Sequence, residues 1–290
     1  MTACTAAHAV RIAAAFVAAC RDELDAPKPG NVHVFADGHR MTAAEFERSA
    51  QAAAGPLTAP GARVGLRILR AVEATRAAVG TNTNLGIILL CAPLAAAAEH
   101  QPADLRGALT ELLENLDVAD ADLAFRAIAL ASPAGLGQVE HHDVRAPATV
   151  TLAAAMAEAA GRDRIAHQFS TGFADIFDRG MARRDAAAAR WADPRWATLA
   201  VYLGFLGDFP DSHIVRKYDA AVAEDVRRTA HRFERRLRHE EPEGLLADLL
   251  AWDRSLKQRA LNPGTSADLT VATLFAHRLR GILPSASNSG

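Results

Sequence analysis

The sequence predicts an all-α protein built as a single compact multi-helix domain. Alanine, the strongest helix former, is abundant throughout. Alternating runs of β-branched and aromatic residues are scarce, and apolar residues recur instead at helical spacing between short breaker segments. Half of the 290 residues are apolar, which is enough to bury a substantial core.

The helices can be placed in chain order from this periodicity and from the Pro, Gly and Asn residues between them. The breakers are Pro27–Gly30, Gly55–Pro56, Pro60–Gly61, Pro133–Gly135, Gly207–Pro210 and Asn262–Gly264. We expect helices over 5–25, 42–54, 62–79, 85–100, 104–114, 118–131, 146–160, 165–179, 185–206, 220–239, 243–259 and 267–280. No internal repeat or long linker is present, so residues 1–283 are predicted to be a single helical catalytic domain and 284–290 a disordered tail.

Charge and hydropathy favour a small-molecule partner. The formal net charge is −2, with 32 basic against 34 acidic residues, so no global field favours nucleic acid or an anionic membrane. The arginine-rich stretch 216–239 is interleaved with acidic residues, as in a salt-bridged solvent face. The apolar run 86–98 is shorter than the ~20 residues of a membrane span. We expect a cytoplasmic protein and leave a homodimer open, since alanine-rich helices also pack between chains.

The three cysteines, Cys4, Cys20 and Cys91, lack the paired spacing of a zinc site or a disulfide framework. They are expected to be reduced and mostly buried. One alternative is a lipoprotein cleavage site at 17–20, which follows a short apolar run. The simpler interpretation is an amphipathic first helix.

Two segments suggest binding of an anionic ligand. In 27–33, two prolines stiffen the chain, Gly30 permits close approach of backbone to ligand, and Lys28 could present its charge to a phosphate. An ordinary tight connection explains this segment equally well. In 80–86, hydroxyl and amide side chains precede an apolar helix whose N-terminus would attract anions: Thr81, Asn82, Thr83 and Asn84.

Two further segments carry metal-ligand chemistry. His141 and His142 could suggest zinc, but adjacent histidines cannot both face one ion from a regular helix. Asp175 and Asp178 are three residues apart on a predicted helix and would share one face, which suits a magnesium ion. A solvated acidic face is the alternative.

The last two segments, 208–217 and 261–269, combine carboxylates, hydroxyls and cations. The second begins with an Asn-Pro-Gly turn and continues into a helix that has Asp268 in its first turns. It could be a well-formed helix start, or it could close a site for phosphate and metal.

Taken in order, 28–30, 80–83, 211–216 and 263–269 resemble the signature segments of triphosphoribosyl-dephospho-CoA synthases, and the resemblance spans nearly the whole chain. It implies a helical enzyme that transfers the triphosphoribosyl part of ATP to dephospho-CoA and releases adenine. Such a glycosyl transfer needs a base for the attacking hydroxyl, carboxylates near the positive sugar centre and cations for the triphosphate.

The resemblance implies a role for each candidate residue. Asp268 or Asp143 would be the base, and Asp211, Asp175 and Asp178 would bind Mg²⁺, with Asp211 also catalytic. Lys28, Arg216 and Lys217 would hold phosphates, while Asn82, Thr83 and Ser266 would position ribose or phosphate oxygens. The remaining expected substrate contacts are Gly30, Asn31, Thr81, Asn84, Ser212, Gly264 and Thr265.

The chain departs from the family pattern at two places. The family motif continues with His-Lys where this chain has Asn84 and Leu85, and Leu-Val-Asp is replaced by 31–33. These departures indicate that the ligand or its pose differs from that of the family. Residues 135–145 and 162–178 resemble instead a divergent branch of the family found in archaea and methylotroph-type bacteria, whose hosts commonly use tetrahydromethanopterin. The acceptor implied is dephospho-CoA or, as the alternative, a ribose- and phosphate-bearing pterin precursor of tetrahydromethanopterin-type cofactor synthesis. A non-catalytic protein that binds a nucleotide or a cofactor is the alternative of another class.

Overall fold

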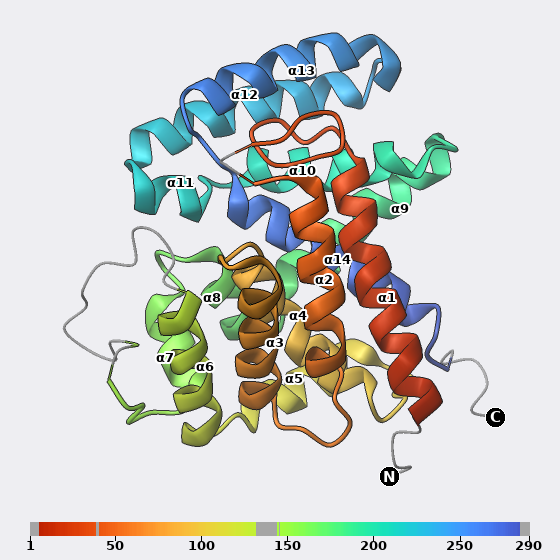
Figure 1. The fold of residues 1–290 in the computed structure, drawn as a ribbon. Coiled ribbons are helices and arrows are strands. Elements are labelled where there is room, and N and C mark those ends of the chain that lie inside the picture. The colour runs from red at the N-terminus through yellow and green to blue at the C-terminus, as the bar shows by residue number, and fades with distance from the viewer. Residues whose placement is uncertain (1–5, 39–40, 132–143, 145, 285–290) are drawn as a thin grey trace.

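The computed structural model describes residues 6–38, 41–131, 144 and 146–284. Within these ranges it contains fourteen α-helices, one π-helix and no strand (Figure 1). Two isolated β-bridges, His33 to Ala36 and Gly38 to Met41, close a short excursion between the first two helices. The prediction of an all-α single compact domain is confirmed.

The first half of the chain surrounds a buried central helix. Its helices are α1 (Ala6–Asp25), α2 (Ala43–Leu57), α3 (Val64–Val79), α4 (Leu85–Ala98), α5 (Leu105–Glu114) and α6 (Val118–Ala131). Every residue of α4 is buried, so this helix lacks the polar face of its neighbours. It packs against α3, α5 and α14, which places its N-terminus inside the molecule.

The second half adds α7 (Leu152–Ala159), α8 (Arg164–Ser170), η1 (Asp175–Gly180), α9 (Met181–Arg190), α10 (Pro194–Asp208), α11 (Ser212–Lys217), α12 (Ala220–Leu237), α13 (Pro242–Gln258) and α14 (Gly264–Arg280). Helices α12 and α13 form a layer at the opposite end of the molecule from α5 (Figure 1). The last helix, α14, contacts α1, α4 and α10, so the end of the chain joins both halves.

Three predicted helices differ from the structure, and one helix was missed. The prediction of a single helix over 165–179 is wrong, because Gly172 and Phe173 take positive φ angles of 58° and 60° and separate α8 from η1. The helix over 185–206 is interrupted before Pro194, which starts α10 after an Asp193 cap. The helix expected over 146–160 begins only at Leu152, and the short α11 was not predicted.

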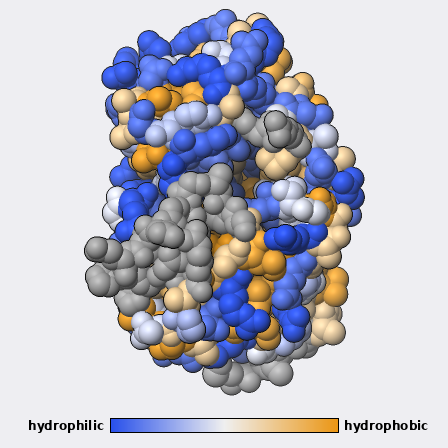
Figure 2. All heavy atoms as spheres, turned by 60° about the vertical axis from the view of Figure 1, so that its left-hand side comes forward, coloured by the Kyte–Doolittle hydropathy of each residue, from blue (hydrophilic) through white to orange (hydrophobic). Residues whose placement is uncertain are grey.

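Within the described ranges, no helix is both long and apolar enough to cross a bilayer. The space-filling view shows hydrophilic residues over much of one face, with apolar areas between them (Figure 2). Cys20 and Cys91 are buried free thiols, as expected for core cysteines, whereas Cys4 lies outside the described residues. The predicted tail lies mostly outside them too.

Candidate active site

Asp268, one turn into α14, points toward the N-terminus of α4. A Cβ atom added to Gly86 would lie 2.0 Å from Asp268 Oδ2, so the carboxylate lies directly against the α4 backbone. Within the described part of the chain, no group donates a hydrogen bond to this carboxylate. Burial raises the pKa of Asp268 well above its ordinary value, and the negative charges of Asp211 and Glu23 raise it further. An unpaired carboxyl with a raised pKa is suited to accept a proton.

Asp211, the residue before α11, acts as a structural link. Its Oδ1 accepts backbone hydrogen bonds from His213 and Ile214 at 3.0 and 3.3 Å. Its Oδ2 accepts from the backbone N–H and the hydroxyl of Ser266, both at 2.8 Å. A carboxylate offers about four acceptor positions, and here all four are used. Asp211 thus ties α11 to the start of α14, and the expectation that it binds magnesium or reacts directly is not supported by this geometry.

Hydroxyl groups complete this junction. Ser212 Oγ accepts a hydrogen bond from the Arg164 backbone N–H at 2.9 Å, and Thr265 Oγ1 accepts from the His213 N–H at 3.2 Å. Gly264 leaves room for the imidazole of His213, since a Cβ there would lie 3.0 Å from Nδ1. Ser212, Gly264, Thr265 and Ser266 therefore hold the starts of α8, α11 and α14 together beside Asp268.

Arg216 and Lys217 lie differently with respect to this junction. Arg216 forms an ion pair with Asp163, whose other oxygen caps α8 through the Ile165 N–H at 2.8 Å. The buried Nε of Arg216 has no hydrogen-bond partner among the described residues, and the Arg216 charge acts on Asp268. Lys217 is exposed; its ammonium donates to the Ala260 carbonyl at 3.5 Å and lies 5.4 Å from the centre of the Tyr218 ring. Arg216 is thus placed to bind an anion near Asp268, whereas Lys217 points to the surface.

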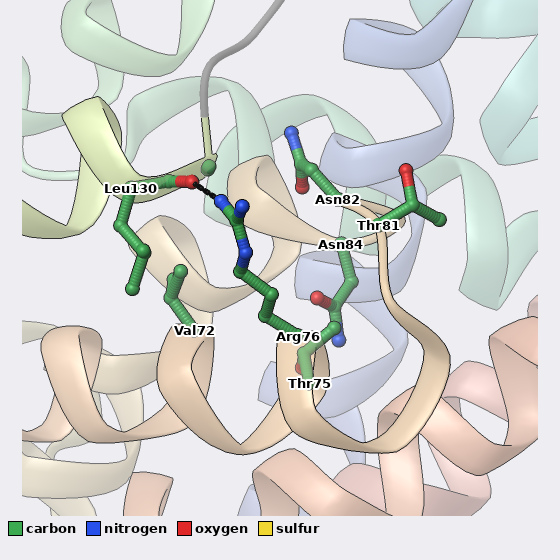
Figure 3. A pocket seen from close by; sticks show the side chains of 8 residues that line it. Val72, Thr75, Arg76, Thr81, Asn82, Asn84 and Leu130 are labelled. Carbon is green, nitrogen blue, oxygen red and sulfur yellow. Dashed lines mark hydrogen bonds between the residues drawn. The ribbon is translucent and has the colours of Figure 1, made fainter.

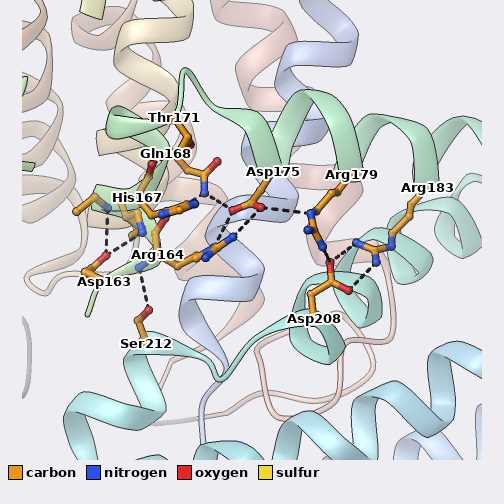
Figure 4. A network of polar contacts seen from close by, with 12 residues as sticks. Asp163, Arg164, His167, Gln168, Thr171, Asp175, Arg179, Arg183, Asp208 and Ser212 are labelled. Atoms are coloured by element: carbon orange, nitrogen blue, oxygen red, sulfur yellow. Dashed lines mark hydrogen bonds and ion pairs between the residues drawn. The ribbon is translucent and has the colours of Figure 1, made fainter. Parts of the chain in front are cut away.

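Asp175 and Asp178 do not form the expected shared metal site. Asp175 accepts a two-pronged ion pair from Arg164 at 2.7 and 2.8 Å and a hydrogen bond from Gln168 at 2.6 Å (Figure 4). Although burial opposes it, hydrogen bonding to Arg164 and Gln168 lowers the pKa of Asp175. Asp178 is paired at the surface with Arg106, at 2.5 and 2.9 Å. In the described ranges, no three His, Cys, Asp or Glu residues cluster to hold a metal ion.

Figure 4 shows that Asp175 belongs to a longer network. Arg179 bridges Asp175 to Asp208, and Arg183 forms two hydrogen bonds with Asp208, at 2.9 and 2.7 Å. These ion pairs join α8, η1, α9 and α10 beside the candidate site. Arg164 also lies over the Phe209 ring at 4.4 Å, which fixes its position further.

Lys28 is fully buried and does not face a ligand. Its ammonium donates to Glu23 at 2.6 Å, Asn31 Oδ1 at 3.2 Å and the Val32 carbonyl at 2.5 Å. An ammonium has three donors, and these three acceptors use them all. The expectation of a phosphate-binding lysine is therefore corrected: Lys28 holds its own loop to the end of α1.

That loop supports the start of α14. The Gly30 N–H donates to Asp253 Oδ1 at 2.8 Å, and a Cβ on Gly30 would lie 2.8 Å from Pro263. Gly30 also has a positive φ of 82°, so both the backbone conformation and the close contact with Pro263 require glycine here. Asn31 donates to the Asn262 side chain at 2.8 Å. Gly30 and Asn31 thus position the 261–264 turn, and both are buried.

Some side chains of the 81–84 segment form structural hydrogen bonds, and some line a pocket. The Asn82 carbonyl oxygen accepts from the Leu85 N–H at 3.1 Å, and the Thr83 hydroxyl donates to Ser49 at 2.7 Å. Thr81, Asn82 and Asn84 line a pocket (Figure 3). Leu85, at the position of the family lysine, is buried in the main core.

Two expected features of the site lie outside the described residues, and two residues of the site were not predicted. Asp143, the second candidate base, and the histidine pair lie outside the described residues. Asp163 was not predicted as a site residue, although its position before a helix is a recognisable capping signal. Arg164 was not predicted either, because its partner Asp175 follows after a reversal of the chain and no local pattern exists for it.

The arrangement combines a carboxyl and a guanidinium Nε–H that both lack a hydrogen-bond partner among the described residues with the N-termini of two long helices, α4 and α14. Helix N-termini carry partial positive charge and favour anions such as phosphates. A site of this kind can take a proton from a hydroxyl while it neutralises phosphate charge. Its chemistry fits group transfer from a phosphorylated donor.

The comparisons with known proteins agree with this assignment. The family model for ATP:dephospho-CoA triphosphoribosyl transferase matches residues 9–286. A solved structure from Archaeoglobus fulgidus, provisionally named triphosphoribosyl-dephospho-CoA synthase, is similar in fold with a TM-score of 0.62 and 21% identity; the similarity covers 82% of this chain and 98% of that one. No curated protein sequence matches the chain. On the match of the family model over nearly its whole length, this chain belongs to the ATP:dephospho-CoA triphosphoribosyl transferase family and is a transferase.

Proposed function

We propose that this protein transfers the triphosphoribosyl group of ATP to a hydroxyl of a phosphorylated cofactor precursor, with Asp268 as the general base. The observation that carries the proposal is the Asp268 carboxylate, which is unpaired among the described residues and lies against Gly86 at the start of α4. Its neighbours at the start of α14 are already committed to structural hydrogen bonds. Asp268 is the member of the group that remains available to a substrate.

The reaction balances around one proton. The acceptor hydroxyl attacks C1′ of the ATP ribose, the C1′–N9 bond breaks and its electrons leave with adenine. Asp268 takes the hydroxyl proton as the new C1′–O bond forms and later returns it to water. Adenine leaves as the N9 anion and takes a proton from water, so that in net one proton passes from the acceptor hydroxyl to adenine. General-base catalysis of this type contributes roughly 10²–10⁴-fold to rate.

Arg216 and the helix N-termini of α4 and α14 supply the positive field for the triphosphate. Asp163 holds the guanidinium of Arg216 through Nη1, and the buried Nε–H, which has no partner among the described residues, is available to a phosphate. A charge-assisted hydrogen bond from it to a phosphate oxygen is stronger than a neutral one. Asp163 and Ser212 keep this end of the site in position from α8 and α11.

Magnesium does not fit the three carboxylates first expected to hold it. Asp211 has used its acceptor positions, Asp175 is occupied by Arg164 and Gln168, and Asp178 is paired at the surface with Arg106. No step of the proposed mechanism is therefore assigned to a metal ion. A magnesium requirement stays a prediction, and chelator titration of the activity tests it.

The acceptor is proposed from the residues that replace the family's His-Lys pair. Leu85 is buried in the core and Asn84 is uncharged, so this end of α4 lacks the cation found in the family motif. Loss of one phosphate-facing cation disfavours an acceptor held in the same pose as dephospho-CoA. A pterin precursor that bears ribose and phosphate is therefore kept as the second acceptor.

An adenine-release assay tests the proposal. Purified protein is incubated with ATP and with dephospho-CoA, a pterin precursor or no acceptor, and free adenine is measured by chromatography. Asp268→Asn, which keeps the shape of the side chain, should abolish release, while Asp225→Asn at the exposed end of an ion pair should not. Release that is unaffected by Asp268→Asn would refute the assigned base. No release with any acceptor, despite ATP binding, would overturn the transferase proposal for these substrates.

A further inference from the structure

A small pocket lies between α3, the end of α6 and the 81–84 turn (Figure 3). It is lined by Val72, Thr75, Arg76, Thr81, Asn82, Asn84, Leu130 and Ala131. Arg76 and Thr81 are exposed, whereas Thr75 and Asn84 are only 2% and 4% exposed, so the pocket leads from the surface to two buried polar side chains. The space has room for about one water molecule. A ring system is too large for it.

The hydroxyl of Thr75 has no hydrogen-bond partner among the described residues. A threonine inside a helix can donate to the carbonyl four residues earlier, as Thr270 and Thr273 do in α14 at 2.8 and 2.9 Å. Thr75 lies inside α3 but does not use the Ala71 carbonyl in this way. Leaving a buried hydroxyl unpaired is costly, so this group indicates a partner in the pocket.

The carboxamide of Asn84 is the second buried group without a partner. Asn84 is the N-cap residue of α4, a position where asparagine commonly bonds the backbone of the first helical turn, but it makes no capping bond. In the described part of the chain, no other group bonds its carboxamide. The carboxamide carries two N–H donors and an acceptor oxygen. It therefore needs a partner that is able to donate or accept.

The rest of the lining suits water. Among the described residues that line the pocket there is no carboxylate, which a bound metal cation would favour. A buried water molecule typically makes about three hydrogen bonds to polar groups. Thr75 and Asn84 supply two of them. The carboxamide of Asn82 adds further N–H donors at the wall, since its oxygen is already bound to the Leu85 N–H at 3.1 Å.

We infer that one ordered water molecule binds in this pocket and joins the Thr75 hydroxyl to the Asn84 carboxamide. Because water both donates and accepts, it completes the two groups together. It links α3 to the N-cap residue of α4, in place of the capping bond that Asn84 does not make. Gly86, two residues further along, lies against Asp268, so the water also helps to hold the turn of α4 that faces the candidate base.

A high-resolution crystal structure tests the site directly. The wild type should show one ordered water molecule within hydrogen-bond distance, ~2.7–3.2 Å, of Thr75 Oγ1 and of the Asn84 carboxamide. Thr75→Ser keeps the hydroxyl and should keep the water. An empty pocket in the wild type, or a Thr75 hydroxyl turned to the Ala71 carbonyl, would overturn the inference.

The sign of a stability change gives a second test, in solution. Thr75→Val exchanges the hydroxyl for a methyl group of the same shape. If water is bound, this change breaks a hydrogen bond and leaves the buried Asn84 carboxamide less well paired, so the melting temperature should fall by roughly 2–4 °C. If the hydroxyl has no partner, its removal relieves a cost, and a melting temperature that stays the same or rises would contradict the water site.

Thr229→Val on α12 is the matched control for this exchange. The Thr229 hydroxyl donates to the Asp225 carbonyl of its own helix at 3.1 Å, and threonine and valine have similar helix propensities. The melting temperature of this variant should therefore stay within about 1 °C of the wild type. Neither the crystal structures nor the melting curves need a substrate, so their outcome does not depend on the proposed reaction.

Discussion

The carboxylate of Asp268 lies so close to Gly86 that a Cβ on Gly86 would sit 2.0 Å from Oδ2. A single methyl group would therefore displace the candidate base. Gly86→Ala would also meet the Ile165 side chain at 2.7 Å. Both obstacles are ends of side chains, so we expect the fold to persist while Asp268 moves.

We predict that Gly86→Ala lowers kcat by roughly 10²-fold, because a displacement of ~1 Å from productive geometry can cost that much. Steady-state measurement of adenine release gives kcat for the variant and the wild type. Gly55→Ala in α2, where a Cβ meets nothing within 4 Å, is the control and should stabilise the protein by ~0.5–1 kcal/mol with no effect on rate. A fully active Gly86→Ala variant would show that Asp268 does not act from this position.

Asp268→Asn should lose activity and gain stability. The raised pKa of Asp268 means that the folded protein holds its ionised form less well than the unfolded chain does. Below the ordinary aspartate pKa of ~3.9 this group costs nothing, and its cost grows as the pH rises through the raised pKa. At neutral pH, asparagine removes that cost. Thermal unfolding should show a higher melting temperature for Asp268→Asn, and a lower one would contradict the burial argument.

The same pKa shift sets the pH dependence of catalysis. A general base must be ionised, so kcat/KM should fall on the acid side with an apparent pKa above the ordinary ~3.9 of aspartate. Rates measured from pH 4 to 9, with melting temperatures recorded at each pH, separate this effect from unfolding. Any residual activity of Asp268→Asn should not show this fall of kcat/KM on the acid side. An acid limb near or below the ordinary value would exclude Asp268 as the group that titrates.

The Lys28–Glu23 pair should behave as a structural unit. Lys28→Met alone leaves a buried, unpaired carboxylate and should cost ~3–5 kcal/mol in unfolding free energy. Adding Glu23→Leu removes that charge and should recover part of the loss, which urea denaturation measures. The folded double variant should bind ATP within about twofold of wild type. A tenfold or larger loss would restore the phosphate-binding role first expected from the sequence.

The helices could be predicted because their signals are local. Apolar periodicity, caps and breakers placed most of them correctly, and the Pro-Gly-Thr-Ser-Ala-Asp segment made Asp268 a candidate base. The break at Phe173 could not be foreseen, since a positive φ of 60° at a non-glycine residue is imposed by packing. The partners of the charged groups were equally hidden. Lys28 and Asp175 looked available because Glu23 and Arg164 reach them only after the chain turns.

Asp211 and Asp268, which the sequence could not distinguish, should respond in opposite directions to replacement by asparagine. Asp211→Asn places an amide N–H₂ against backbone N–H groups or the Ser266 hydroxyl, because Asp211 accepts all of its four hydrogen bonds. It should destabilise the fold by ~1–3 kcal/mol, the cost of unsatisfied buried polar groups, and so oppose the effect of Asp268→Asn. Ser266→Ala, which removes one of the four donors, should cost ~1 kcal/mol. Chemical denaturation of the three variants at pH 7 decides the matter. If Asp211→Asn is as stable as wild type and inactive, Asp211 takes part in the reaction, and the structural role argued from its hydrogen bonds is wrong.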